Sequence, residues 1–154
     1  MKDVPDTPAG LKARALGYLA RREHTRAELA RKLAAHAASR EALDALLDDL
    51  QRGKQLSDER YAEQRVRTLA RKYGSGRIRR ELRARGIGEE DAASAVRATA
   101  EEDLSRAIGI LRRKYREPAV SREEGAKRAR FLQGRGFSFE IIKRALKLSS
   151  ESCG

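Results

Sequence analysis

The chain has 154 residues, with 35 Lys or Arg against 23 Asp or Glu and a net charge of +12. Its 38% charged and 5% aromatic residues leave material for only a modest core, built mainly from Leu and Ala, which favours helices. No apolar run approaches the roughly 20 residues that cross a bilayer, and the lone Cys153 excludes a disulfide framework or a thiolate metal site. The positive surplus indicates nucleic acid or an acidic protein as a partner.

Residues 1–10, MKDVPDTPAG, are predicted to form a disordered lead-in, because Pro5, Pro8 and Gly10 disfavour helix. The segment lacks the hydrophobic region of a secretory signal. A cytoplasmic protein is therefore expected.

Residues 11–55 are predicted to form a module of three helices. The first covers residues 11–22, with Leu16 and Leu19 on its inner face. The second begins at Thr25, which forms a capping-box pattern with Glu28, and the third follows Ser39 as its N-cap. Further inward-facing leucines are expected at Leu29, Leu33, Leu43, Leu46, Leu47 and Leu50.

The pattern of this module recurs twice. Its reference leucine, Leu33, has equivalents at Leu82 and Leu132, at spacings of 49 and 50 residues. Four residues after each comes a small residue, alanine in the first case and glycine (Gly86, Gly136) in the others, where glycine suits a left-handed helix C-cap. The tripeptide RKY at 71–73 likewise recurs at 113–115.

The repeat predicts an all-α fold of three tandem three-helix modules, over residues 11–55, 56–99 and 100–148, followed by a polar tail at 149–154. A module of about 50 residues with few large apolar side chains is only marginally stable alone. Neighbouring modules should therefore stabilise one another in an elongated array.

The third module departs from the pattern. Pro118 interrupts helix after the first element, and Ser121 restarts it with a second capping box. Arg128 occupies the position that Leu29 and Ile78 hold in the other modules. The middle helix is therefore expected to pack differently, or to depend on the neighbouring Ala129 and Phe131.

The most basic stretch runs over residues 65–85 and contains nine Lys or Arg against one acid, Glu81. Helical spacing places Ile78 and Leu82 on a buried stripe, with the basic side chains of residues 77, 79, 80 and 83 facing away from it. Such a face could simply be solvated, but a face that serves only solubility usually mixes both signs. A polyanion or an acidic protein surface fits better.

A second basic cluster spans residues 112–116 and continues through 127–135. Tyr73 and Tyr115 lie within the clusters and are interpreted first as packing residues, with base stacking as the alternative. The third helices begin with acidic residues, which would repel phosphates, so sequence-specific duplex reading is disfavoured against non-specific backbone contact. The candidate partner-binding residues are Arg71, Lys72, Arg77, Arg79, Arg80, Arg83, Arg112, Arg113, Lys114, Lys127 and Arg130.

No catalytic motif is present, so we expect a protein that is not an enzyme and has no cofactor or metal. The GSG at 74–76 is interpreted as a loop and N-cap, with a phosphate cradle as the weaker alternative. His24 and His36 are expected to be surface residues at helix ends.

Three motifs resemble the RecX family of regulatory proteins: ALGYLARREHTRAELARKL (15–33), LSDERYAEQRVR (56–67) with GSGRIRRELRARGI (74–87), and RGFSFEIIKRAL (135–146). The resemblance covers residues 11–147 and implies an all-helical, three-repeat modulator of the RecA recombinase. Such proteins bind RecA and its filament on single-stranded DNA, lie in the filament groove and suppress filament growth, strand exchange and ATP hydrolysis. They act in recombination, DNA repair and the SOS response. Ala37 and Arg128 depart from the repeat.

The expected partners are RecA and its nucleoprotein filament, with single- or double-stranded DNA bound weakly, no membrane, and a monomeric protein. The alternative is a freestanding, non-specific DNA-binding protein that acts by coating DNA. Interaction with RecA in the absence of DNA would separate the two.

Overall fold

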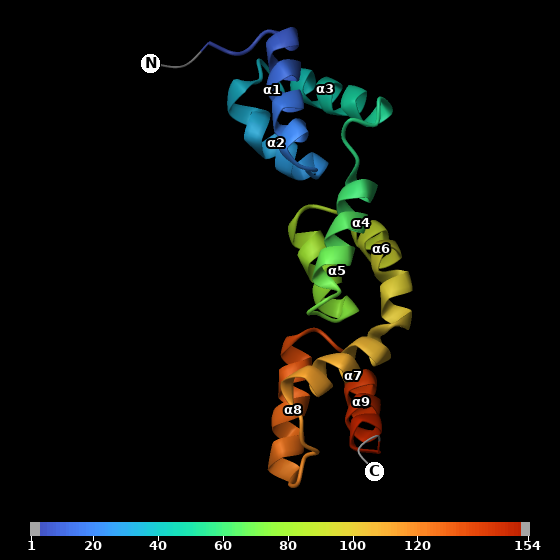
Figure 1. Ribbon diagram of the computed structural model, residues 1–154. Coiled ribbons are helices and arrows are strands. Elements are labelled where there is room, and N and C mark those ends of the chain that lie inside the picture. The colour runs from blue at the N-terminus through green and yellow to red at the C-terminus, as the bar shows by residue number, and fades with distance from the viewer. Residues whose placement is uncertain (1–3, 152–154) are drawn as a thin grey trace.

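The computed structural model describes residues 4–151, which form three helical bundles arranged one after another (Figure 1). Within this range there is helix but no strand, and α1 and α9 lie at opposite ends of an elongated body (Figure 1). The elements are α1 (Pro8–Arg21), α2 (Arg26–Leu33), the 3₁₀ turn η1 (Ala34–His36), α3 (Arg40–Arg52), α4 (Asp58–Leu69), α5 (Ser75–Ala84), α6 (Glu89–Glu101), α7 (Asp103–Lys114), α8 (Arg122–Gly134) and α9 (Phe139–Glu151). The predicted all-α architecture of three-helix repeats is confirmed.

Each bundle has its own apolar core. The first is built from α1–α3, the second from α4–α6 and the third from α7–α9. The repeat leucines Leu33, Leu82 and Leu132 are completely buried, one in each core. Leu56, which was predicted to begin the second module, packs in the first core instead.

The helix ends follow from local chemistry. The Thr25 hydroxyl accepts from the Glu28 N–H (3.0 Å), while the Glu28 carboxylate accepts from the Thr25 N–H (3.3 Å), which confirms the capping box. At the other ends of α5 and α8, Gly86 and Gly136 have φ values of 92° and 93°, the left-handed conformation that glycine adopts at little cost. Ala37 has φ −80°, and α2 ends in η1 instead.

Helix extends closer to both ends of the chain than expected. Helix α1 begins at Pro8 with Thr7 as its N-cap, because proline fits the first helical turn, so residues 8–10 are not a disordered lead-in. The Asp6 N–H donates to the His36 carbonyl oxygen (2.8 Å). At the C-terminal end, residues 149–151 belong to α9. Residues 1–3 and 152–154 of the predicted lead-in and tail lie outside the described residues.

The inner face of α1 also differs from expectation. Leu11 and Ala15 are buried, whereas Leu16 is exposed and Leu19 only partly buried. The core therefore uses a face of α1 rotated from the predicted one by about 100°, the step between adjacent helical residues.

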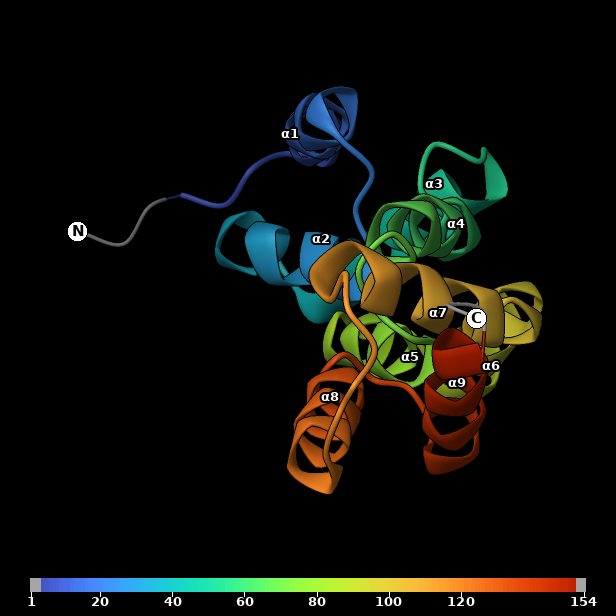
Figure 2. The same cartoon turned by 60° about the horizontal axis from the view of Figure 1, so that its bottom comes forward.

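The third bundle has the altered middle helix that Arg128 predicts. Only Leu132 of α8 is buried, and Ala129 and Phe131 pack against the core from half-buried positions. The Arg128 guanidinium lies over the Tyr115 ring (4.4 Å) and donates to the Glu117 carbonyl oxygen. Helix α9 packs against both α7 and α8, and Figure 2 shows α8 and α9 extending from beneath α7.

Candidate partner-binding groove

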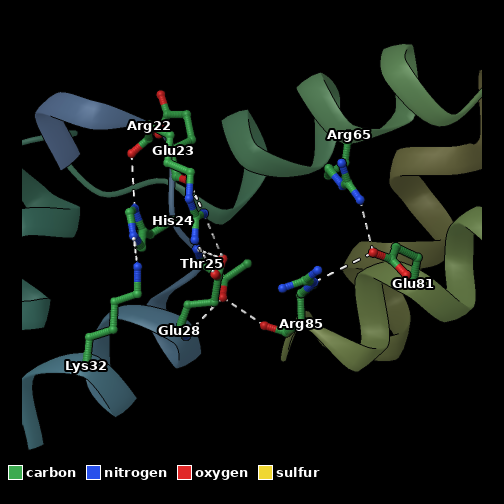
Figure 3. Close-up of polar contacts among 9 residues, drawn as sticks. All are labelled: Arg22, Glu23, His24, Thr25, Glu28, Lys32, Arg65, Glu81 and Arg85. Carbon is green, nitrogen blue, oxygen red and sulfur yellow. Dashed lines mark hydrogen bonds and ion pairs between the residues drawn. The ribbon is translucent and has the colours of Figure 1, made fainter. Parts of the chain in front are cut away.

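The first and second modules meet where α2 begins. The Thr25 hydroxyl donates to the Arg85 carbonyl oxygen at the end of α5 (2.7 Å, Figure 3), and the Arg26 N–H donates to Asp58 at the start of α4 (2.7 Å). Ala27 approaches Gly86 so closely that a Cβ at position 86 would lie 2.3 Å from the Ala27 Cβ. The glycine thus serves the junction as well as the helix end.

The second and third modules meet through equivalent contacts. The Gly74 N–H donates to the Arg135 carbonyl oxygen (2.7 Å), and the Ser75 N–H donates to Asp103 at the start of α7 (3.3 Å). A Cβ at Gly136 would lie 2.3 Å from that of Arg77. Gly74, Ser75, Arg135 and Gly136 are the repeat equivalents of Thr25, Arg26, Arg85 and Gly86 in the first junction, while Arg77 lies one residue beyond the equivalent of Ala27. The same joining geometry is therefore used twice, with a shift of one residue at the glycine contact.

The GSG segment at 74–76 is part of the junction between the second and third modules. Gly74 is the N-cap of α5, as the loop interpretation predicts. The N–H groups of Gly74 and Ser75 already donate to Arg135 and Asp103, and added Cβ atoms at Gly74 and Gly76 would lie 2.7 and 2.9 Å from the Gly136 carbonyl oxygen. The segment is a close-packed joint, and these two N–H groups are not available to a phosphate.

An open groove runs along the junction of the second and third modules. The second module contributes Arg67, Ala70, Arg71, Lys72 and Tyr73, and the third contributes Glu102, Ser105, Arg106, Gly109, Ile110, Arg113, Lys114, Phe131 and Arg135. The lining therefore holds seven cationic side chains against one carboxylate. Both copies of the RKY tripeptide reach it.

Several of these cations have no carboxylate to neutralise them. The side chains of Arg67, Arg71, Lys72 and Arg113 make no ion pair or hydrogen bond within residues 4–151, and all four are exposed. Arg106 differs, because its guanidinium is paired with Asp103 and donates to the carbonyl oxygens of Tyr73 and Thr99. Unpaired cations in a groove attract an anionic partner at low desolvation cost.

Aromatic rings hold the remaining cations of the groove. Arg135 lies 5.4 Å from the Tyr73 ring and 5.1 Å from the Phe131 ring, and Lys114 lies 3.8 Å from Phe131. Arg77 covers Tyr73 at 4.0 Å. Tyr73 also packs against the second core, so the packing interpretation of this ring holds.

The predicted basic residues fall into separate places. Arg71, Lys72, Arg113 and Lys114 gather in the groove. On α5, Arg79 and Arg83 share the carboxylate of Glu89, Arg77 donates to the Gly134 carbonyl oxygen (3.0 Å), and Arg80 is exposed. Lys127 and Arg130 are exposed on α8, and Arg112 lines a different hollow beside the loop that follows α7.

Three residues that line the groove were not among the predicted site residues: Arg67, Arg106 and Arg135. Arg67 and Arg135 lie in basic stretches, but only the fold assigns them to one surface. Arg106 has no such signal, because its position depends on Asp103 and on a carbonyl from the preceding module.

His24 is a second correction, because this residue is 1% exposed and not on the surface. A lysine ammonium can only donate, so Nε2 accepts from Lys32 (2.8 Å) and Nδ1–H donates to the Arg22 carbonyl oxygen (3.0 Å, Figure 3). Burial lowers the pKa of His24, and the charges of Arg22 and Lys32 lower it further against the opposing effect of the carbonyl. The ring is held neutral.

Glu28 is the anionic partner in the same cluster. Burial alone would raise the pKa of Glu28, but hydrogen bonds from the Arg22 guanidinium (2.9 Å) and the Thr25 N–H hold it below its usual value. This cluster ties the end of α1 to the start of α2 beside the first junction (Figure 3).

The fold and the groove define a class: a tandem three-helix array with a basic surface across one of its joints. Family models of RecX match all three modules, the first three-helix domain at residues 12–50, the second at 57–96 and the third at 101–146. The chain belongs to the RecX family.

Curated relatives match over nearly the whole chain. The Regulatory protein RecX of Ralstonia nicotianae is 43% identical over 144 residues, covering 94% of this chain and 91% of the relative. That of Herbaspirillum seropedicae is 44% identical and covers 94% of both chains. The crystal structure of RecX from Lactobacillus salivarius has the same fold, with a TM-score of 0.84, 23% identity and coverage of 94% and 97%.

Within residues 4–151 no helix combines the length and apolar character needed to cross a membrane.

Proposed function

We propose that the protein binds the RecA recombinase and its filament on single-stranded DNA, and that it inhibits filament growth, strand exchange and ATP hydrolysis without catalysing a reaction. The observation that carries the proposal is the groove between the second and third modules, where unpaired Arg and Lys side chains from both modules face solvent. Membership of the RecX family supports the same function.

The repeated joint explains why a filament suits this chain. Two junctions built from similar hydrogen bonds join the first module to the second and the second to the third. A polymer of identical subunits likewise offers equivalent sites at a fixed step. Weak contacts of successive modules then add, because binding by one module raises the effective concentration of the next. An elongated monomer lying in the filament groove would bind through the sum of these weak contacts.

Charge supplies the attraction. The surplus cations of the groove face either acidic side chains of the recombinase or phosphates of its DNA, and both attractions weaken with salt. Arg71 and Arg113 are the sharpest probes, since they come from opposite sides of the joint and are exposed and unpaired within the described residues.

The test is a double charge reversal, Arg71→Glu with Arg113→Glu. We expect it to weaken inhibition of RecA at least tenfold, because four units of charge change where the partner binds. ATP hydrolysis and filament length on single-stranded DNA are measured during titration with the protein. Circular dichroism checks that the helices remain.

The matched control reverses two exposed arginines of the first module, Arg31→Glu with Arg40→Glu, which changes the net charge equally but outside the groove. Equal inhibition by wild type and the groove variant, or equal loss in both variants, would contradict the assignment of the groove.

Freestanding DNA coating is the second candidate, and the surplus of groove cations over carboxylates favours it. That function requires direct DNA binding whose log–log salt slope is near −0.9 per phosphate contacted on duplex. It also predicts no interaction with RecA when DNA is absent. Pull-down of RecA without nucleic acid therefore separates the candidates.

A further inference from the structure

The groove has two banks that belong to different modules. Arg67, Arg71 and Lys72 come from the second module, and Arg113 and Lys114 come from the third. Neither module alone carries the full set. The separation of the banks, and therefore the pattern of charge that a partner meets, depends on the joint between the modules.

A buried carboxylate holds this joint. Asp103, the first residue of α7, is only 5% exposed. It accepts from the Ser75 hydroxyl (2.6 Å) and from the Ser75 N–H (3.3 Å), and so it ties the first turn of α7 to the first turn of α5. An anion at the start of α5 is also favoured by the helix dipole.

Arg106 extends the same contact to the groove. Its guanidinium is paired with Asp103 and donates to the carbonyl oxygens of Tyr73 (3.1 Å) and Thr99 (2.8 Å). Tyr73 directly follows Arg71 and Lys72 in the chain. The network thus connects the carboxylate of α7 to the backbone beside one bank, while Arg113 projects from the same α7 on the other bank.

We infer that Asp103, together with Ser75 and Arg106, positions the two banks of the groove for the partner, and that this lock is a determinant of binding as well as of the fold. The inference rests on the proposed function. Without the buried acceptor, the Ser75 hydroxyl and the Arg106 guanidinium lose their shared partner, and the hydrogen bonds that join the first turn of α7 to the first turn of α5 are lost.

The chain supplies its own control. Asp58, at the start of α4, accepts from the Arg26 N–H in the first junction, as Asp103 accepts from the Ser75 N–H in the second. Replacing Asp58 removes the same kind of bond from a joint that does not border the groove. An effect that depends only on weakening a junction would therefore appear in both variants.

The experiment compares Asp103→Asn with Asp58→Asn. Spin labels on two exposed positions, Gln64→Cys in α4 and Gln133→Cys in α8 of a Cys153→Ser background, report the distance distribution between the modules by double electron–electron resonance. We expect Asp103→Asn to broaden this distribution and to weaken RecA inhibition on the order of tenfold. Asp58→Asn should leave the width of the distance distribution and the strength of RecA inhibition within about twofold of the parent.

Ser75→Ala is the milder second variant, because it removes the hydroxyl but keeps the N–H bond to Asp103. It should broaden the distance distribution and weaken RecA inhibition, each by less than Asp103→Asn does. If Asp103→Asn does not fold, Ser75→Ala serves as the test variant. Three outcomes overturn the inference: an unchanged distance distribution, a broadened distribution with parental inhibition, or equal losses in the Asp58 and Asp103 variants. If the parent does not bind RecA at all, the proposed function fails, and the distance measurement still reports whether the lock sets the spacing.

Discussion

His24 is held between two partners whose roles are fixed, the Lys32 ammonium and the Arg22 carbonyl oxygen. Protonation of Nε2 would remove the bond from Lys32 and place a third positive charge beside Lys32 and the Arg22 guanidinium. The pKa of His24 is therefore lowered by burial and by these charges. In the unfolded chain the imidazole titrates near its ordinary value of about 6.5.

The direction of the pH effect follows from linkage. Below about pH 6.5 the unfolded chain binds a proton that the folded chain does not, so the free energy of unfolding falls as the pH falls from 7.5 to 5.5. Thermal unfolding across this range measures the slope. His24→Asn should be less stable at pH 7.5 but show a flatter pH profile. Equal slopes in the parent and the variant would contradict this role of His24.

Glu28 contributes in a different pH window. Its pKa is below the ordinary carboxyl value, so its contribution to stability is present above about pH 4.5 and is lost as the pH falls through the folded pKa. Measurements between pH 5.5 and 7.5 therefore exclude the contribution of Glu28.

At the level of elements, Gly86 joins two functions that glycine alone satisfies. It ends α5 with φ 92°, and it permits the contact with Ala27 at the first junction. We expect Gly86→Ala to lower the free energy of unfolding by about 2–4 kcal/mol, through left-handed strain and steric overlap. Urea unfolding measures the loss.

Gly88 provides the matched control for this substitution. An added Cβ at Gly88 meets no atom within 4 Å, and its φ of −62° suits any residue. Gly88→Ala should therefore be tolerated within about 1 kcal/mol. Similar losses in the two variants would show that neither the left-handed backbone of Gly86 nor its contact with Ala27 contributes to stability.

Elements were predictable from the sequence where their cause is local. The capping box at Thr25 and the glycine at the end of α5 depend on neighbouring residues, so the sequence located both. The predicted inner face of α1 was wrong because the apolar residues of this helix can form more than one buried face. Contact with the other helices buries Leu11 and Ala15 and leaves Leu16 exposed. The burial of His24 depends likewise on partners in α1 and α2.

The groove was predictable only in part. Charge alone located Arg71, Lys72, Arg113 and Lys114 as candidates, since runs of one sign stand out in a sequence. Their grouping into one surface depends on the angle between modules, which is set by contacts between residues far apart in the chain, such as Ser75 with Asp103. The sequence could not supply that angle.

On the scale of the whole molecule, one acceptor position recurs three times. The carbonyl oxygens of His36, Arg85 and Arg135 are repeat equivalents. Each accepts a hydrogen bond from a residue just before a helix, and the donors are Asp6, Thr25 and Gly74, respectively. In the first case the donor is Asp6, just ahead of α1, which takes the place that a preceding module would have. Asp6 is held there by the Arg14 guanidinium (2.8 Å). The acceptor of the first module is thus occupied by the segment that leads into α1.

Three separate cores joined by small junctions should respond locally to damage, as in other repeat proteins. Leu33, Leu82 and Leu132 occupy the same repeat position and are each completely buried, so they form a matched series. Replacing any one with alanine should cost about 2–5 kcal/mol of local stability. Hydrogen exchange resolved by segment should place the loss in the module that carries the substitution.

The functional consequences should differ, because only the second and third modules line the groove. At a temperature where the damaged module is unfolded, Leu132→Ala should abolish the proposed inhibition of RecA, since it removes the bank that carries Arg113 and Lys114. Leu33→Ala should retain most of it, with a loss limited to the additive contact of the first module. Equal loss of inhibition, or exchange that rises uniformly over all three cores, would mean that the chain unfolds as one cooperative unit and that the modules do not act as separate bodies.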